Sequence, residues 1–144
     1  MLDEIFKNNR VQEEVIRLNQ EQLQAGVDSN NEVIITKTAE YERKGKVYAM
    51  QTIQIKKEKG QPTDVVTLKD TGDFYNSFRV KITKLGYEIT ADFKAKTIKD
   101  SILENFDSYY RDTILGLDNE SLAELVYETI LPRLTKMIRE KLNV

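Results

Sequence analysis

The sequence predicts an α+β fold: a small antiparallel sheet centred on a β-hairpin at about residues 78–93, packed against long N-terminal and C-terminal helices. Three observations predict it. Apolar residues recur at helical spacing through the first 25 residues and again from about residue 119 to the end, and two apolar–polar alternations lie on either side of Gly86. A chain of 144 residues has the size of one domain, so we expect a single domain over 1–144.

The first 25 residues favour a long amphipathic helix. Residues 2–25 contain no Pro or Gly, with a weak point at 7–9, and Gly26 can end the helix in a left-handed conformation. One side of this helix carries a stripe at helical spacing: Val11, Val15, Leu18 and Gln22. The polar residues 27–31 predict a turn, and the β-branched residues of 32–36 predict a short strand.

The middle of the chain holds shorter elements. Residues 37–46 are polar and predict a connection, and 48–57 fit a strand or a helix, with the helix preferred. Gly60-Gln61-Pro62 ends that element, because Pro lacks an N–H and disfavours helix in the preceding residue. An extended run is expected at 65–68 and a short helix at about 97–106.

The clearest elements are a hairpin and the C-terminal helix. Residues 78–83 and 87–93 alternate between apolar and polar, and Asp118 or Asn119 can cap a helix that runs to the end of the chain. That helix carries a second apolar stripe: Leu122, Leu125, Val126, Ile130, Leu134, Ile138 and Leu142. Pro132 lies inside the pattern and is expected to kink the helix or split it in two.

The composition excludes several function classes. The chain has no Cys, which excludes disulfides and thiolate metal sites and fits a reducing compartment, and it has no His, which removes His-dependent catalysis and nearly every zinc site. No apolar run approaches the length of about 20 residues that a membrane span needs, and no secretion signal is recognisable. We therefore expect a non-enzymatic protein without cofactor or metal, acting away from membranes.

The net charge of −2 hides a segregated pattern. Residues 37–59 hold seven Lys or Arg against three Asp or Glu, and residues 100–128 hold one Arg against eight Asp or Glu. Such blocks can be solvated faces or pair within one subunit. They can also face each other across copies of the same protein, where opposite charges set the register and orientation of the contact.

Asp70-Thr71-Gly72 is the tripeptide that carries the catalytic aspartate in aspartic proteases. A chain with one such tripeptide must dimerise to bring two carboxylates to one shared proton. Here Lys69 favours the charged form of Asp70, and Asp73 adds another carboxylate nearby, so a proton-sharing pair is disfavoured. A strand-to-helix corner explains the same residues better: Thr71 can cap a turn that Gly72 permits, followed by about one helical turn.

This corner carries a resemblance to a known group of proteins. An apolar-x-x-Thr-Gly-x-apolar-x-x-Ser pattern that runs into a hairpin resembles the signature of small virion morphogenesis proteins of tailed phages and prophages. That group includes head–tail joining, neck, minor tail and tail-completion proteins. The stretches LNQEQLQAGVDSNNEVI and ILGLDNESLAEL are also similar to such proteins. The matching residues are Leu68, Thr71, Gly72, Phe74, Ser77 and Phe78, followed by the strand at 79–82.

The resemblance implies a non-enzymatic virion component that assembles as a homo-oligomeric ring or collar at the head–tail junction or tail end. Its partners would be further copies of itself and portal, adaptor or tail-tube proteins, with DNA met at most through the lumen. It would be found in the virion, and in the host cytoplasm during assembly. Head-to-tail contacts can close into such rings. Tyr75, Tyr109 and Tyr110 are candidate contact residues, although aromatic residues of this kind also serve simple core packing.

A nucleic-acid-binding module is the alternative from another class. Tyr41 and Tyr48 lie among the basic residues of 43–59 and could stack on bases. The acidic balance of the whole chain and the lack of a known binding fingerprint oppose this alternative. The basic residues concerned are Arg43, Lys44, Lys46, Lys56, Lys57 and Lys59.

Overall fold

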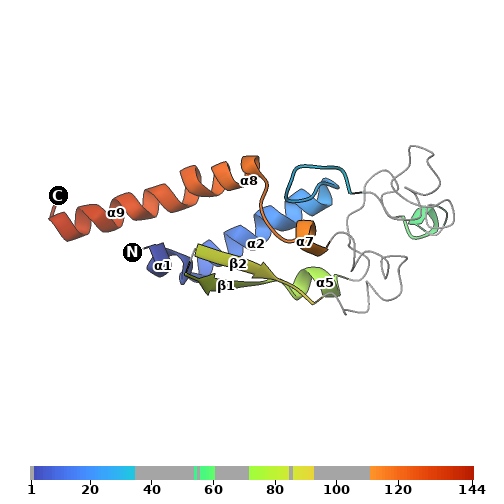
Figure 1. The fold of residues 1–144 in the computed structure, drawn as a ribbon, viewed down its shortest axis with the longest axis horizontal. Coiled ribbons are helices and arrows are strands. Elements are labelled where there is room, and N and C mark those ends of the chain that lie inside the picture. Colours follow the sequence, from blue (N-terminus) through green and yellow to red (C-terminus); the bar gives the residue numbers. More distant parts are fainter. Residues whose placement is uncertain (1, 35–53, 55, 61–71, 85, 93–110) are drawn as a thin grey trace.

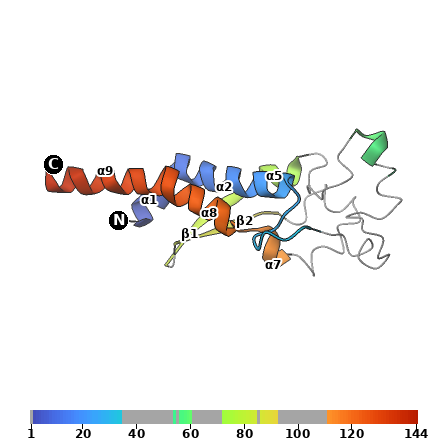
Figure 2. The same ribbon diagram turned by 90° about the horizontal axis from the view of Figure 1, so that it is seen from above.

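The protein is α+β, with a two-stranded antiparallel hairpin packed against its N-terminal and C-terminal helices. A computed structural model describes residues 2–34, 54, 56–60, 72–84, 86–92 and 111–144. Helix α2 (Asn9–Gln24) forms the middle layer, because it contacts strand β1 (Arg79–Thr83) on one side and the C-terminal helix on the other (Figures 1 and 2). The fold class expected from the sequence is confirmed.

The N-terminal helix is broken where the polar residues 7–9 interrupt it. Helix α1 (Leu2–Phe6) ends before this point, and α2 starts anew because the Asn8 side chain accepts a hydrogen bond from the Arg10 N–H at 3.0 Å. Gly26 follows α2 in a left-handed conformation, with φ of 79°, as expected for a helix stop. The predicted stripe of Val11, Val15, Leu18 and Gln22 is buried throughout.

The turn that follows α2 is built around Asp28. Its carboxylate accepts hydrogen bonds from the backbone N–H groups of Asn30 and Glu32, at 2.9 and 3.0 Å. Of the strand expected at 32–36, residues 32–34 are described and hold one isolated β-bridge, between Val33 and Val27, while residues 35 and 36 lie outside the described residues. Two backbone hydrogen bonds flank this bridge: the Asp28 N–H donates to the Glu32 carbonyl at 2.9 Å, and the Ile34 N–H donates to the Gly26 carbonyl at 2.8 Å.

The hairpin follows the predicted alternation. Strand β1 pairs with β2 (Gly86–Thr90), and the apolar pairs Val80–Ile89 and Ile82–Tyr87 share one face. Lys81 lies opposite Glu88 on the other face, where both side chains are exposed and their opposite charges are compatible. The hairpin therefore presents its apolar face to the core.

The C-terminal helix is continuous through Pro132. It begins with α8 (Asn119–Glu124), passes through a π-helix η2 (Leu125–Ile130) and ends as α9 (Leu131–Leu142). Asp118 caps it, as expected, by accepting from the Ser121 N–H at 2.8 Å. The helix does not split at Pro132, because a π-helix precedes it: the Leu131 N–H bonds to the Val126 carbonyl, five residues back. The wider turn accommodates a proline that has no N–H to donate.

Most of the described elements contribute to one apolar core. Phe74 and Tyr75 come from the short helix α5 (Asp73–Asn76), and Ile114 comes from α7 (Arg111–Ile114). The buried apolar side chains are Ile5, Phe6, Val11, Val15, Leu18, Leu23, Ile34, Phe74, Tyr75, Phe78, Ile89, Ile114, Leu125 and Ile130. In the C-terminal helix only Leu125 and Ile130 are buried, both in η2, and neither α8 nor α9 has a buried residue.

Two buried amides on α2 hold the chain segment that leads into the C-terminal helix. Asn19 donates to the Ile114 carbonyl at 3.1 Å and accepts from the Gly116 N–H at 2.9 Å. One turn later, Gln22 donates to the Gly116 carbonyl at 3.0 Å and accepts from the Asp118 N–H at 2.9 Å. We call these four hydrogen bonds the amide clamp. They satisfy buried backbone groups that no secondary structure pairs.

Several predicted elements lie outside the described residues. These are the connection at 37–46, the extended run at 65–68 and the helix at 97–106. Of the segment 48–57, residues 54, 56 and 57 are described, and they are helical, as preferred.

The amide clamp predicts a large effect of a small substitution. Asn19→Ala should lower the free energy of unfolding by about 2–4 kcal/mol, because it leaves one buried carbonyl and one buried N–H without partners. Urea unfolding followed by circular dichroism measures this difference. Gln24→Ala is the matched control: it removes an exposed amide from the same helix and should change stability by less than about 0.5 kcal/mol. Equal effects of the two substitutions would contradict the clamp.

Candidate functional site: an aromatic corner and an exposed helix face

The corner that carries the sequence resemblance begins at Gly72. This residue has φ of 89° and ψ of −6°, and it is the N-cap of α5. Its carbonyl accepts the first hydrogen bond of that helix, from the Asn76 N–H at 2.9 Å. A residue with a side chain rarely adopts this φ, and this explains why the motif has a glycine at this position.

The apolar positions of the motif meet in an aromatic cluster. The rings of Phe74 and Phe78 lie edge to face with centroids 5.1 Å apart, and Tyr75 lies within 6.2 Å of both. All three side chains are buried. Tyr75, a candidate contact residue in the sequence analysis, is 6% exposed and therefore packs within its own chain.

Ser77 joins the corner to the end of the hairpin. Its hydroxyl donates to the Phe74 carbonyl at 2.6 Å and accepts from the Asp92 N–H at 2.8 Å. A hydroxyl can do both at once, which explains a serine at this position. Gln20 of α2 donates to the Tyr75 carbonyl at 2.8 Å and fixes the corner to the middle layer.

The corner is thus an inward-facing structural unit. Its described members Gly72, Phe74, Ser77 and Phe78 are brought together as the motif predicts. Leu68, Asp70 and Thr71 lie outside the described residues, and with them the proposed cap and the aspartate of the protease alternative.

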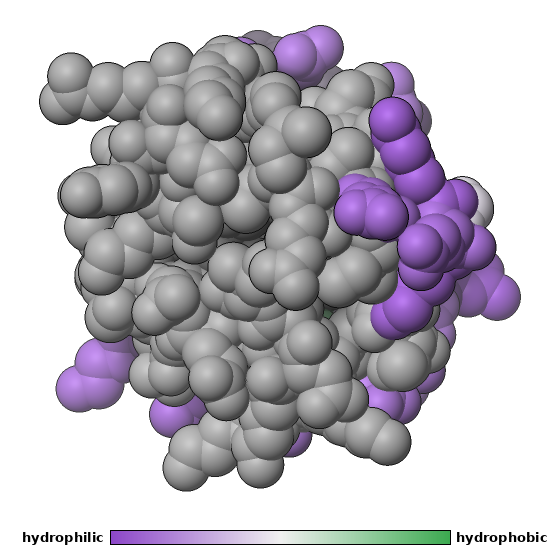
Figure 3. All heavy atoms as spheres, turned by 90° about the vertical axis from the view of Figure 1, so that its right-hand side faces the viewer, coloured by the Kyte–Doolittle hydropathy of each residue, from purple (hydrophilic) through white to green (hydrophobic). Residues whose placement is uncertain are grey.

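The basic stretch is described only in part. Lys56 and Lys57 are helical, and the side chains of Lys57 and Lys59 are exposed. Figure 3 views this end of the molecule, where the visible described residues are mostly hydrophilic. The other predicted contact residues lie outside the described part: Arg43, Lys44, Lys46, Tyr109 and Tyr110.

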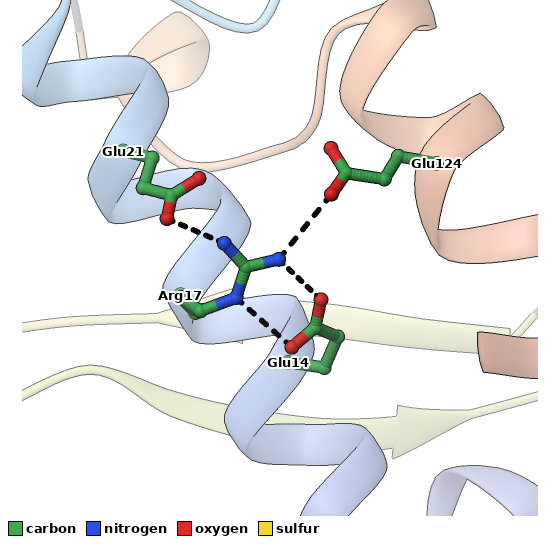
Figure 4. Close-up of polar contacts among 4 residues, drawn as sticks. All are labelled: Glu14, Arg17, Glu21 and Glu124. Atoms are coloured by element: carbon green, nitrogen blue, oxygen red, sulfur yellow. Dashed lines mark hydrogen bonds and ion pairs between the residues drawn. The ribbon is translucent and has the colours of Figure 1, made fainter. Parts of the chain in front are cut away.

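A charged cluster on α2 was not anticipated from the sequence. Arg17 points from α2 towards α8 and bonds to Glu14, Glu21 and Glu124 (Figure 4). The Arg17 Nε lies 3.0 Å from Glu14, and its contact with Glu124 is longer, at 3.4 Å. The hydrogen bond from Arg17 holds the pKa of Glu14 below its ordinary value. The spacing of Glu14, Arg17 and Glu21 was a readable signal, but the approach of Glu124 is a property of the fold.

The second functional feature is an apolar face that the chain leaves uncovered. Figures 1 and 2 show α9 extending past α1 and the hairpin. Towards the end of this helix the expected apolar stripe is exposed, with Ile138 41% and Leu142 66% exposed, and Leu131 beside it is 40% exposed. Tyr127 of η2 is 70% exposed. We call these four residues the C-terminal stripe, and a surface of this kind is typical of a protein contact.

Comparisons with known proteins do not assign this chain to a family. No family model matches the chain, and no curated protein or solved structure is significantly similar to it. Among the described residues, none of the helices is long and apolar enough to cross a membrane, and no group of three or more acidic side chains is placed to hold a metal ion.

The corner predicts a conformational cost at Gly72. Gly72→Ala should lower the free energy of unfolding by about 1–2 kcal/mol, because the backbone must keep a left-handed conformation. An added Cβ would meet no atom closer than 3.9 Å, so a steric clash does not contribute. Gly72→Asn is the matched variant and should lose less, since Asn tolerates this region better. Thermal unfolding of both variants tests the order, and a larger loss for Asn would contradict it.

The Arg17 cluster predicts a pH-dependent contribution. Because the pKa of Glu14 is lowered on folding, its stabilisation is present above its ordinary value near 4.5 and is lost as pH falls through the lowered value. Arg17→Gln should therefore cost about 0.5–1 kcal/mol at neutral pH and less in acid, as for an exposed pair. Urea unfolding at several pH values measures this. Arg10→Gln, an exposed arginine on the same helix, should show no such trend.

Proposed function

We propose that this protein is a non-enzymatic structural component of a tailed-phage or prophage virion. It acts in neck or tail assembly at the head–tail junction or tail end, as a subunit of an oligomeric ring or collar. Its partners are further copies of itself and portal, adaptor or tail-tube proteins.

The observation that carries this proposal is the aromatic corner. The motif that resembles those virion proteins forms a turn that leads into a hairpin. Each of its described residues stabilises this turn. Gly72 supplies the left-handed turn, Phe74 and Phe78 pack edge to face, and Ser77 bonds to both sides of the corner. The described residues that carry the resemblance therefore form one folded unit.

The C-terminal stripe supports the same proposal from another side. Subunits of an assembly must offer apolar surface to one another, and obligate contacts between subunits resemble a protein core more than an ordinary surface. Tyr127 and Leu142 are the most exposed residues of this stripe. Tyrosine is among the residues enriched in such contacts.

The proposal predicts higher-order assembly. The purified protein, alone or mixed with portal, adaptor or tail-tube proteins of a tailed phage, should form discrete oligomers of more than two copies. Light scattering after size exclusion measures their mass, and electron microscopy shows whether they are rings. The proposal would fail if the protein formed nothing larger than a dimer at high concentration and bound none of those components.

A further inference from the structure

Three residues of the C-terminal stripe are, together with Leu134, spaced like the seam of a coiled coil. Tyr127, Leu131, Leu134 and Ile138 follow one another at intervals of four, three and four residues, which is the spacing of heptad core positions. Leu134 is partly buried against the core and forms the edge of the stripe, while the other three are at least 40% exposed. An uncovered seam of this kind fits a second helix.

The charges along the same helix indicate which second helix can bind to this seam. Residues 118–128 hold four acidic residues and no basic one, and residues 133–141 hold four basic residues and one acidic residue. Two parallel copies would place like charges side by side. Two antiparallel copies would place the acidic half of each helix beside the basic half of the other.

We propose that the C-terminal stripe binds the same stripe of a second copy of this chain, with the two helices antiparallel about a twofold axis. The register follows from the spacing: Leu131 lies opposite the partner's Leu134, which brings Tyr127 opposite the partner's Ile138. The axis then passes between Pro132 and Arg133. A twofold contact of this kind is self-complementary and closes with two copies.

The flanking charges agree with this register. Glu128 directly follows Tyr127, and Arg139 directly follows Ile138, so both lie on the same flank of the stripe. A twofold axis brings equal flanks together. Arg139 then lies level with residue 126 of the other copy, about 3 Å along the axis from both Glu124 and Glu128 of that copy, since the helix rises about 1.5 Å per residue.

The π-helix contributes to this arrangement. It spans Leu125–Ile130 and bonds every fifth residue instead of every fourth, so residues four apart lie more nearly in line than in an α-helix. Tyr127 and Leu131 are one such pair. The segment that accommodates Pro132 thus also aligns Tyr127 with the stripe of α9.

This inference does not depend on the virion role. A ring needs contacts that do not close with two copies, so ring assembly would use other surfaces of the pair or of the single chain. Failure of pairing would leave the proposed function open to its own test, and failure of ring assembly would leave pairing intact.

The test is a charge exchange between two variants. Arg139→Glu and Glu128→Arg each place like charges together at both symmetric contacts, so each alone should weaken dimerisation about tenfold or more. Mixed in equal amounts, they should form a heterodimer, because each contact between position 139 of one chain and position 128 of the other is again attractive. Sedimentation velocity at low salt, across a concentration series, measures the dimer of the natural chain, of each variant and of the mixture.

Lys136→Glu is the matched control. It makes the same change of charge at an exposed position of α9 outside the stripe and its flank, and should dimerise like the natural chain. Ile138→Ser should abolish the dimer while circular dichroism shows the monomer still folded, since Ile138 is already 41% exposed. A natural chain that stays monomeric overturns the proposal, as does a mixture that recovers no dimer. Protection of the stripe only by a different protein would also overturn it.

Discussion

The arrangement of this protein depends on the amide clamp between α2 and the segment before the C-terminal helix. Residues 115–118 lead from α7 to α8 without forming a helix or strand, so the peptide groups of this segment need partners from elsewhere. Asn19 and Gln22 supply both donors and acceptors, one helical turn apart. Side-chain amides suit this task because each carries a donor and an acceptor on one rigid plane. The clamp also ends where Asp118 caps α8, so it sets the position at which the long helix starts.

That starting point explains why the end of the helix is uncovered. The C-terminal helix runs along α2 from the clamp, and Leu125 and Ile130 are buried where the two helices overlap. Beyond this overlap α9 continues past the N-terminal elements, so the apolar spacing persists while the core does not (Figure 1). An apolar stripe that its own chain leaves exposed lowers the stability and solubility of the protein unless another molecule covers it. The exposed face is therefore a consequence of the layout of the core.

The periodic part of the fold could be predicted from the sequence, and the non-periodic part could not. The buried stripe of α2, the hairpin, the cap at Asp118 and the left-handed Gly26 all followed from spacing or from one residue's conformational preference. Of the strand expected at 32–36, the described residues 32–34 form only one bridge, next to a tight turn that the Asp28 carboxylate holds. The split predicted at Pro132 was wrong, because a π-helix accommodates a proline that has no N–H to donate. The clamp and the Arg17–Glu124 contact join residues about a hundred positions apart, which no local pattern indicates.

The corner determines part of the fold, whereas the C-terminal stripe determines what the protein can bind. The described residues that carry the resemblance point inward or shape the backbone, so they can persist in any protein that needs this turn before a hairpin. A partner protein contacts only residues at the surface. The large apolar side chains of the corner, Phe74, Tyr75 and Phe78, are all buried. The corner therefore accounts for the local fold, while the choice of partner depends on surfaces such as α9. For that reason the charges beside Tyr127 and Ile138, rather than the motif, decide whether two copies of this chain recognise each other.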